Sequence, residues 1–367
     1  MPTFAAKLSR WQKLHGRSNL PWQSTRDPYA IWISEIMLQQ TQVTTVIPYY
    51  LRFLQRFPDI ESLASGSVDE VLALWSGLGY YSRGRNLHRA ACLIAKDQGG
   101  IFPRGVEAIE QLPGIGRSTA AAIAAFAYGV RCAILDGNVK RVFARCFGME
   151  GYPGERKNEM LLWEKAEALL PEESEPGKIE TYTQALMDLG ATVCTRGKPK
   201  CGVCPLQRDC IAFQDKRVDR LPVPRPSRQL PRRETVLLML MQQGKVLLEK
   251  RPVTGIWGGL WCLPEMPSSE NAIAYCTQRF GMKVVLLAHM PPLDHTFTHF
   301  RLRIHTQPLE VVSFLPTAKM AETGRQGGVI WVAPGDALKM AIPTPVRKLL
   351  VQYGYPQSGQ LFFEKAT

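Results

Sequence analysis

The stretch IEQLPGIGRSTAAAIAAFAYG, residues 109–129, predicts two helices joined by a tight turn. We expect the first helix to end at Leu112, the sequence PGIG to form the turn, and a helix rich in small residues to follow. Such a turn leaves unpaired backbone N–H groups at the start of the second helix, where they can bind a phosphate oxygen. Gly114 and Gly116 allow a close backbone approach. An ordinary helical turn is the alternative, but the adjacent basic residue favours a helix-hairpin-helix that binds DNA.

A second feature is a run of four cysteines with the spacing C-x6-C-x2-C-x5-C in CTRGKPKCGVCPLQRDC, namely Cys194, Cys201, Cys204 and Cys210. Four thiolates in one short basic loop can enclose a soft metal centre, either an iron–sulfur cluster or zinc. Zinc ribbons usually carry two close C-x2-C pairs, and this run has only one, which favours a [4Fe–4S] cluster. A disulfide framework is disfavoured because such scaffolds are small secreted domains.

Composition narrows the class of protein. The chain has 367 residues, enough for two or three domains, and a formal net charge of +13. This charge favours a polyanionic partner, with nucleic acid as the default, although a basic surface also aids solubility. The sequence has no apolar signal core and no apolar stretch long enough to span a bilayer. We therefore expect no membrane association and a cytoplasmic, nucleoid-associated location.

The pattern divides the chain into a mainly α domain, 1–215, and an α+β domain, 235–356. A basic, proline-rich linker, 216–234, joins them, and a tail, 357–367, follows. In the first domain we expect a helix that begins at Asp27-Pro28 and stops near Pro48, and a capping box from Ser67 to Glu70. In the second domain the predicted strands are 235–241, 245–249, 283–290 and 329–333.

Two carboxylates stand out. Glu35 lies on the first long predicted helix, with Ile31 and Leu38 as helical neighbours, and a carboxyl group on an apolar face should have a raised pKa that suits a general acid. Asp136, in ILDGNVKRV, precedes a predicted helix and could simply be its N-cap. A carboxylate in either setting more often has a structural role, so the pair indicates catalysis only together with further features of the sequence.

The context is a family resemblance that covers about residues 8 to 350. LPGIGRSTA, Asp136 and the cysteine loop resemble, in order and spacing, the endonuclease III superfamily of DNA glycosylases. The chain is further similar to adenine DNA glycosylases of the MutY type in SEIMLQQTQVTTVIPYY, GLGYYSRGRNLHRAA, LDGNVKRV and TQALMDLGATVC. GIWGGLWCLPE and HTFTHFRL resemble the C-terminal domain of that family, which has a Nudix-like fold.

This resemblance implies a substrate and a mechanism. The substrate would be duplex DNA with adenine opposite 8-oxoguanine or guanine, and the adenine would be flipped into a pocket. Glu35 would protonate the base, and Asp136, helped by Asn138, would stabilise the oxocarbenium-like sugar as an anion or a transient nucleophile. The lyase branch has a Schiff-base lysine where this chain has Ser118, so we expect a monofunctional glycosylase.

The resemblance also implies binding roles. Leu20 and Trp22 would line the adenine pocket, and Gln184 would hydrogen-bond the base. Gln40 and Tyr80 would insert into the duplex beside the flipped base, although core packing is an equal alternative for Tyr80. Contact with 8-oxoguanine would come from the loop of Phe297, Thr298 and His299; some family members have serine in place of Thr298. Arg196 and Lys200 would contact DNA phosphates.

Other functions are weighed against this one. A nucleotide pyrophosphatase needs a REx2EExG run, and of its acidic groups only Glu265 is present. Ser118 and the second domain disfavour a lyase that acts on oxidised pyrimidines. The presence of both carboxylates, Glu35 and Asp136, disfavours a protein that binds lesions without catalysis. We expect a monomer. Repair or replication proteins are possible partners, and the tail is either a docking peptide or a frayed end.

Overall fold

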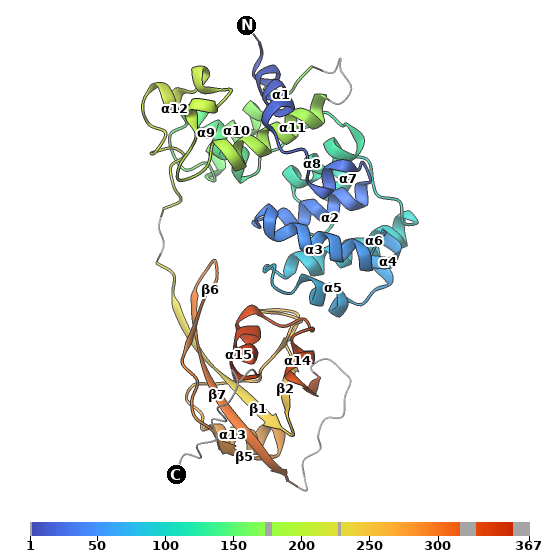
Figure 1. The fold of residues 1–367 in the computed structure, drawn as a ribbon, viewed down its shortest axis with the longest axis vertical. Helices are drawn as coiled ribbons and strands as arrows, with labels where there is room; N and C mark the ends of the chain where they lie inside the picture. Colours follow the sequence, from blue (N-terminus) through green and yellow to red (C-terminus); the bar gives the residue numbers. More distant parts are fainter. Residues whose placement is uncertain (1, 173–177, 227–228, 316–327, 355–367) are drawn as a thin grey trace. The chain divides into compact units, whose positions relative to one another are not determined.

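A computed structural model describes residues 2–172, 178–226, 229–315 and 328–354 of the chain (Figure 1). The chain forms two compact units. The first consists of Met1–Ser65 and Asn86–Ser227, and the second of Gly66–Arg85 and Arg228–Thr367. The second unit therefore includes a short segment from within the predicted helical domain. The predicted tail, 357–367, lies outside the described residues, and the predicted domain boundaries stay a prediction.

The first unit is helical. Its helices are α1 (Phe4–His15), η1 (Pro21–Ser24), α2 (Pro28–Leu38), α3 (Val43–Arg56), α4 (Ile60–Ser65), most of α6 (Ser82–Gln98), α7 (Val106–Glu110), α8 (Arg117–Tyr128), α9 (Gly137–Cys146), α10 (Arg156–Ala168), α11 (Lys178–Asp188), η2 (Leu189–Val193), η3 (Cys201–Val203), η4 (Gln207–Asp209) and α12 (Ile211–Gln214). No helix in the described part of the chain has the length and apolar character needed to cross a membrane.

The start of α2 is as predicted, but its end is not. The Asp27 side chain accepts hydrogen bonds from the backbone N–H groups of Tyr29 and Ala30, as expected for an N-cap. The single helix predicted to run to Pro48 is wrong: α2 ends at Leu38, and a break with Gln40 at φ 56° precedes α3. Pro48 lies inside α3. The buried face of this helix outweighs the hydrogen bond that the proline removes.

The predicted helix-hairpin-helix is present as α7, a turn and α8. Gly114 has φ 81°, and a Cβ atom there would lie 2.8 Å from the Cβ atom of Asn86, so the turn requires glycine. The alanines of α8 are almost all buried, and α8 packs against α2, α7 and α11. The small alanine side chains let α8 pack closely against these helices, and this packing fixes the turn before α8 on the rest of the first unit.

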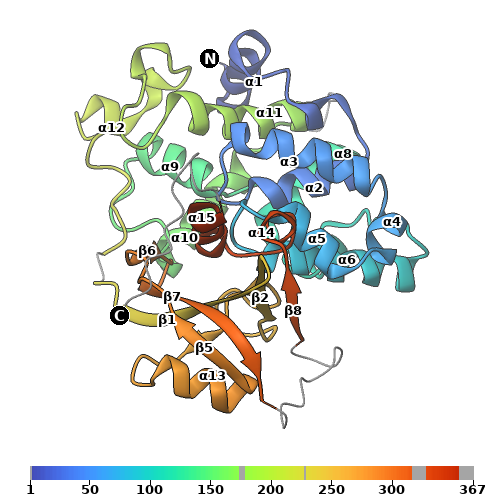
Figure 2. The ribbon, with the colours of Figure 1, turned by 60° about the horizontal axis from the view of Figure 1, so that its bottom comes forward.

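The second unit is an α+β structure built on one sheet (Figure 2). Its strands are β1 (Arg232–Gln242), β2 (Lys245–Lys250), β3 (Trp261–Cys262), β4 (Glu265–Met266), β5 (Met282–Leu286), β6 (Leu293–Thr296), β7 (Arg301–Phe314) and β8 (Val329–Val332). Its helices are α5 (Val68–Trp75), α13 (Ala272–Phe280), α14 (Pro334–Ala337) and α15 (Thr344–Gly354). The long strands β1 and β7 pair in parallel at the centre of the order β3-β2-β1-β7-β5.

Strand β7 was missed by the sequence analysis. Its first half alternates exposed arginines with buried residues, and it contains Pro308, a residue that weighs against a central strand. A buried core nevertheless forms around it, and its members on the sheet and α13 include Leu238, Leu247, Cys276, Met282 and Leu309. The predicted combination of a mainly α part with an α+β part is confirmed.

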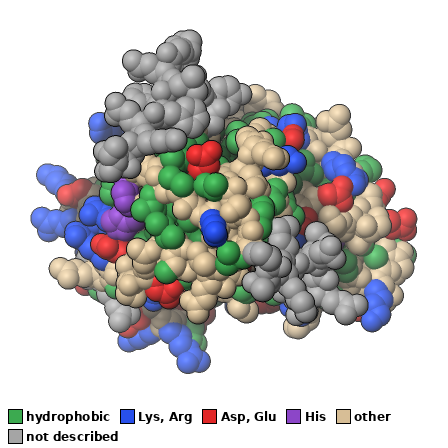
Figure 3. Space-filling view, turned by 90° about the horizontal axis from the view of Figure 1, so that it is seen from below, with side chains coloured by type: hydrophobic (Ala, Val, Ile, Leu, Met, Phe, Trp, Pro, Cys, Tyr) green, Lys and Arg blue, Asp and Glu red, His purple; other side chains and the backbone are tan. Residues whose placement is uncertain are grey.

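The surface of the chain carries mixed charge. On the face in Figure 3, Lys and Arg side chains are scattered among acidic ones, with hydrophobic side chains between them. Val285 and Leu286 on the edge strand β5 are exposed by 44% and 39%. Lys283 and a register shift beside it interrupt this edge, which discourages pairing with a foreign strand.

Candidate active site

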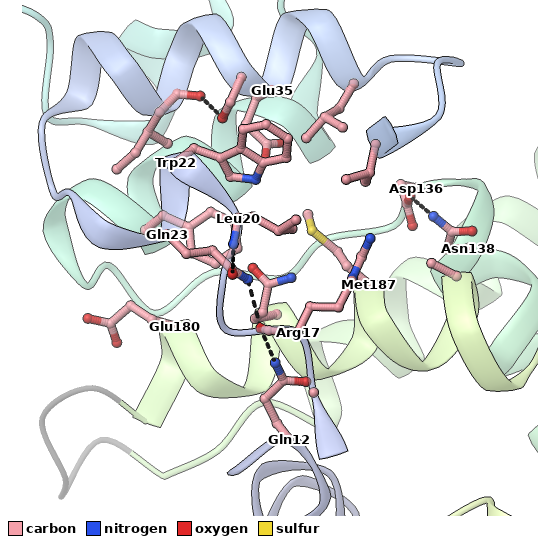
Figure 4. A pocket seen from close by; sticks show the side chains of 18 of the residues that line it. Gln12, Arg17, Leu20, Trp22, Gln23, Glu35, Asp136, Asn138, Glu180 and Met187 are labelled. Atoms are coloured by element: carbon pink, nitrogen blue, oxygen red, sulfur yellow. Dashed lines mark hydrogen bonds between the residues drawn. The ribbon is translucent and has the colours of Figure 1, made fainter. Parts of the chain in front are cut away.

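A large cavity in the first unit gathers many of the predicted site residues (Figure 4). It has a volume of about 1500 Å³ and is bounded by η1, α2, α11 and the start of α9. The predicted residues that line it are Leu20, Trp22, Glu35, Gln40, Ser118, Asp136, Asn138, Gln184 and Arg196. Two carboxyl groups, an indole ring and several amides therefore line one cavity.

Glu35 projects from α2, whose other residues are mostly buried. Its side chain keeps partial exposure toward the cavity, but protein atoms surround it on all other sides. Burial, followed by the negative charge of Asp136, raises the pKa of Glu35 to about 8. Both causes disfavour the ionised form, so this carboxyl group holds a proton at neutral pH.

Asp136 has a different environment. It is the N-cap of α9, and its carboxylate accepts hydrogen bonds from the backbone N–H of Val139 at 2.8 Å and from Nδ2 of Asn138 at 3.0 Å. Burial raises its pKa, while these hydrogen bonds and the charge of Arg141 oppose the rise. These donors favour the ionised form of Asp136, whereas both causes of the shift at Glu35 disfavour its ionised form.

Arg141 connects Asp136 to the cysteine loop. Its guanidinium donates to Oδ1 of Asn138 at 2.8 Å, to the carbonyl of Gly190 at 2.6 Å and to the carbonyl of Cys194 at 2.7 Å. A Cβ atom at Gly190 would lie 2.5 Å from the Cβ atom of Asn138, so α9 and η2 approach as closely as they do because this residue is glycine. Sequence reasoning did not single out Arg141.

The four cysteines of the loop line one small cavity together with apolar side chains, which include Val193, Pro199, Phe213 and Val218. The buried Arg145 donates to Sγ of Cys194 at 3.4 Å and to the carbonyls of Thr195, Arg196 and Leu221 at 2.7 to 3.1 Å. Within the described residues, no group of three or more His, Cys, Asp or Glu side chains is arranged to hold a single metal ion. The soft donors around a cavity, beside a fixed positive charge, fit a thiolate-bound cluster.

The wall of the large cavity depends on Asp188, which sequence reasoning also missed. This fully buried carboxylate accepts hydrogen bonds from the backbone N–H and guanidinium of Arg17 at 2.6 to 2.8 Å, and from Nε2 of Gln184 at 2.9 Å. Gln12 donates to the same carboxylate at 3.0 Å. Trp22, at the opposite wall, packs edge-on against Tyr50 at 5.3 Å between ring centroids. The i,i+4 spacing of Gln184 and Asp188, which lets the two side chains meet on one face of a helix, was the signal in the sequence that could have indicated Asp188.

The residues of the helix-hairpin-helix turn have structural roles as well. Gly116 is the N-cap of α8, and a glycine has no side chain that could accept a hydrogen bond. The backbone N–H groups in the first turn of α8 are therefore not capped by the side chain of this residue. Ser118 accepts a hydrogen bond from the backbone N–H of Leu135 at 2.9 Å, directly before Asp136. Lys140 forms an ion pair with Glu159 at 2.8 Å.

Four predicted residues lie in the second unit and not in the cavity of the first. Tyr80 is 49% exposed and has φ 48°. Phe297 stacks on Phe300 at 4.5 Å between ring centroids, and a backbone hydrogen bond of 2.9 Å joins the two residues. Thr298 and His299, at the tip of this turn, are exposed.

Family models match most of the chain. Residues 33–168 match the HhH-GPD superfamily of base excision DNA repair proteins, 194–210 match the iron-sulfur binding domain of endonuclease III, and 235–352 match a NUDIX domain. The match to 194–210, together with the cysteine-lined cavity, indicates that the chain binds an iron–sulfur cluster. Fold and site therefore define a helix-hairpin-helix DNA glycosylase of base excision repair.

Similar proteins narrow the class. An adenine DNA glycosylase of Buchnera aphidicola subsp. Acyrthosiphon pisum is 36% identical over 350 residues, which are 95% of this chain and 97% of that protein. The human adenine DNA glycosylase is 32% identical over 99% of this chain and 76% of its own. The solved structure of a thermostable thymine-DNA glycosylase, 33% identical, superimposes with a TM-score of 0.52 over 58% of this chain and 95% of its own. The chain belongs to the adenine DNA glycosylase family, so it is an enzyme that removes adenine from DNA.

Proposed function

We propose that this enzyme excises adenine paired with 8-oxoguanine or guanine in duplex DNA, with Glu35 as general acid and Asp136 as the stabilising anion. The observation that carries the proposal is the pair of carboxyl groups on one cavity, because their environments separate their protonation states. Glu35 is thus suited to donate a proton at neutral pH, and Asp136 has hydrogen-bond donors that favour its anionic form.

Glu35 supplies the proton. Adenine is a poor leaving group, and protonation at N7 makes it a better one. A carboxyl group with a pKa of about 8 remains protonated at neutral pH and can deliver this proton inside the cavity. After the base has left, Glu35 is the base that activates the water which completes the hydrolysis.

Asp136 stabilises the positive charge that develops on the sugar. Departure of the base leaves an oxocarbenium-like centre, and a nearby fixed anion lowers its energy or forms a transient bond to it. The hydrogen bonds from Val139 and Asn138 hold the carboxylate in one orientation, which supports this role. Asn138 is itself held by Arg141, so its amide serves as a positioning group.

The reaction stops after base release. A Schiff-base lyase needs an amine at the position of Ser118, and this hydroxyl instead accepts the N–H of Leu135. Lys140 is the nearest lysine in the sequence, and its ion pair with Glu159 disfavours a nucleophilic amine. We therefore propose a monofunctional glycosylase.

Different residues contact the flipped base and the rest of the DNA. Leu20 and Trp22 form the apolar wall for adenine, and Gln184, fixed by Asp188, offers the base a hydrogen bond. Gln40 and Tyr80 insert into the duplex to replace the flipped base; their positive φ angles are consistent with side chains held at loop tips. The turn at Gly114 and Gly116, with Arg196 and Lys200 of the cysteine loop, binds phosphates.

The second unit recognises the partner base. The exposed turn at Phe297, Thr298 and His299 offers an aromatic ring and polar groups for 8-oxoguanine. Nucleotide hydrolysis is disfavoured, because the one matching carboxylate, Glu265, is bound by Arg251 at 2.7 Å. We further propose that the cluster is a [4Fe–4S] cluster with a structural role.

A labelled duplex tests this function directly. The substrate carries one adenine opposite 8-oxoguanine, and half of each sample is treated with alkali after incubation with the enzyme. Breakage at the adenine only after alkali is the expected result. Breakage without alkali would contradict the assignment of Ser118, and no breakage in either half would contradict the substrate.

A further inference from the structure

The loop from Ser76 to Tyr81, which joins α5 to α6, has an unusual backbone. Gly77 and Gly79 have φ angles of 104° and 74°, and Tyr80 follows with φ 48°. A left-handed conformation is uncommon for an aromatic residue and persists only where the surroundings impose it. Arg83 supplies part of that restraint, since its guanidinium donates to the carbonyls of Leu78 and Gly79 at 3.3 and 3.1 Å.

The second part of the restraint comes from the C-terminal end of the described chain. The carbonyl of Ile342, between α14 and α15, accepts hydrogen bonds from Oγ of Ser76 and from the hydroxyl of Tyr81, each at 3.2 Å. The Tyr81 hydroxyl in turn accepts the backbone N–H of Gly77 at 3.4 Å. The carbonyl of Ile342 thus holds both Ser76 and Tyr81 by hydrogen bonds, and these two residues bound the segment that contains Tyr80.

Two further contacts fix this carbonyl and its partners. Ile342 is completely buried, and the adjacent carbonyl of Ala341 accepts the N–H of Trp261 at 2.9 Å, which anchors the segment to β3. Arg347 of α15 donates to Oγ of Ser76 at 3.0 Å, which leaves the Ser76 hydroxyl hydrogen directed at Ile342. We call Ser76, Tyr81, Ile342 and Arg347 the carbonyl clamp.

A separate anchor holds the first turn of α6, directly after the loop. Arg85 donates to the carbonyl of Gly258 at 2.6 Å. Gly258 follows Trp257, whose ring lies 5.8 Å from that of Phe297 between centroids. The loop is therefore also connected to the aromatic cluster beside the turn proposed to meet 8-oxoguanine.

We propose that the carbonyl clamp is a positioning device for Tyr80, so that the C-terminal part of the chain sets the geometry of strand opening in addition to recognising a base. The Tyr81 hydroxyl and Arg347 are positioning residues that act through the Tyr80 ring. This inference rests on the proposed insertion of Tyr80 into the duplex. A ring that is half exposed yet held on a restrained backbone is preorganised for insertion, because little further ordering is needed when DNA binds.

The test is Tyr81→Phe, which removes one hydroxyl and keeps the ring. The matched control is Tyr275→Phe, since the Tyr275 hydroxyl donates to a backbone carbonyl, that of Glu265, at 3.0 Å in the same unit. The readouts are the single-turnover rate of adenine release and the fluorescence of a 2-aminopurine placed beside the lesion, which reports unstacking. We expect Tyr81→Phe to slow release by roughly threefold to tenfold, the effect of one hydrogen bond, and to reduce the fluorescence change. The control should keep the wild-type values.

Repeating Tyr81→Phe in a Tyr80→Leu background distinguishes positioning from general stability. If the clamp acts through Tyr80, the second substitution adds no further loss of rate in that background. Arg347→Met provides an independent variant with the same expected pattern. Wild-type rates in Tyr81→Phe and Arg347→Met, or equal losses with and without the Tyr80 ring, would overturn the inference while leaving the proposed function intact. A wild-type rate in Tyr80→Leu would instead overturn the insertion of Tyr80, and with it the clamp.

Discussion

Replacing Glu35 by glutamine should slow base release strongly and, at the same time, stabilise the folded protein at neutral and alkaline pH. Burial and the charge of Asp136 raise the pKa of Glu35 from its ordinary value of 4.5 to about 8. As the pH rises past 4.5, the unfolded chain loses this proton, whereas the folded chain keeps it until about pH 8. Because the unfolded state binds fewer protons in this window, the free energy of unfolding falls by about 1.4 kcal/mol per pH unit.

The magnitude follows from the width of the window. Between pH 5 and pH 8 the loss amounts to about 4 kcal/mol, and a glutamine, which stays neutral, does not incur it. At roughly 2–4 °C per kcal/mol, the Tm of Glu35→Gln should rise relative to the wild type by about 10 °C across this range. In the same variant, loss of the general acid should slow adenine release by at least about 100-fold.

The assay is thermal unfolding of both proteins at several pH values from 5 to 8. The matched control is Glu61→Gln, which removes an exposed glutamate of α4 that does not line the cavity. The gap between Glu35→Gln and the wild type should widen steadily with pH, while the control follows the wild type. Parallel Tm curves for all three proteins would refute a raised pKa at Glu35 and, with it, the reasoning for the general acid.

Three other predictions follow from the site. Asp136→Asn should slow adenine release by at least about 100-fold while a gel-shift assay still shows duplex binding; a loss below tenfold would contradict its role as the stabilising anion. Asp188→Ala leaves the partly exposed Arg17 and the Gln184 amide without their common acceptor, so denaturant unfolding should show a loss of about 1.5–3 kcal/mol, and a loss under about 0.5 kcal/mol would be inconsistent with a structural role of this carboxylate. Iron and sulfide analysis of the purified protein should give about four of each per chain, as a [4Fe–4S] cluster requires, whereas stoichiometric zinc would exclude the cluster.

Local signals in the sequence predicted the parts of the fold that depend on short-range chemistry. The Asp27 N-cap, the Ser67–Glu70 capping box and the turn at Gly114 each follow from residues within a few positions of one another. The cysteine spacing was similarly local, and its four members do line one cavity.

Features that depend on tertiary packing were beyond the reach of these signals. Pro48 suggested a helix end, but the buried side chains of α3 carry that helix past it. Strand β7 contains Pro308 and alternating arginines, and it is a central strand because β1 pairs with it on one side and β5 and β6 pair with it on the other.

Long-range polar contacts were equally hidden from the sequence. Asp188 lies 171 positions from Arg17, and Arg141 bonds to a carbonyl 53 positions away. Neither spacing has a local signature, so the groups that orient the candidate site emerge only when the helices are assembled. The candidate pair Glu35 and Asp136 became visible in the sequence through resemblance, while their separated protonation states required the cavity.

The pH dependence of adenine release tests the central claim most directly. Single-turnover rates should be measured on a duplex with adenine opposite 8-oxoguanine, from pH 6 to pH 9.5. If Glu35 donates its proton with a pKa of about 8, the rate is level at neutral pH and falls about tenfold per unit above pH 8. A rate that stays level to pH 9.5, or that rises with pH, would contradict a protonated Glu35 as the acid.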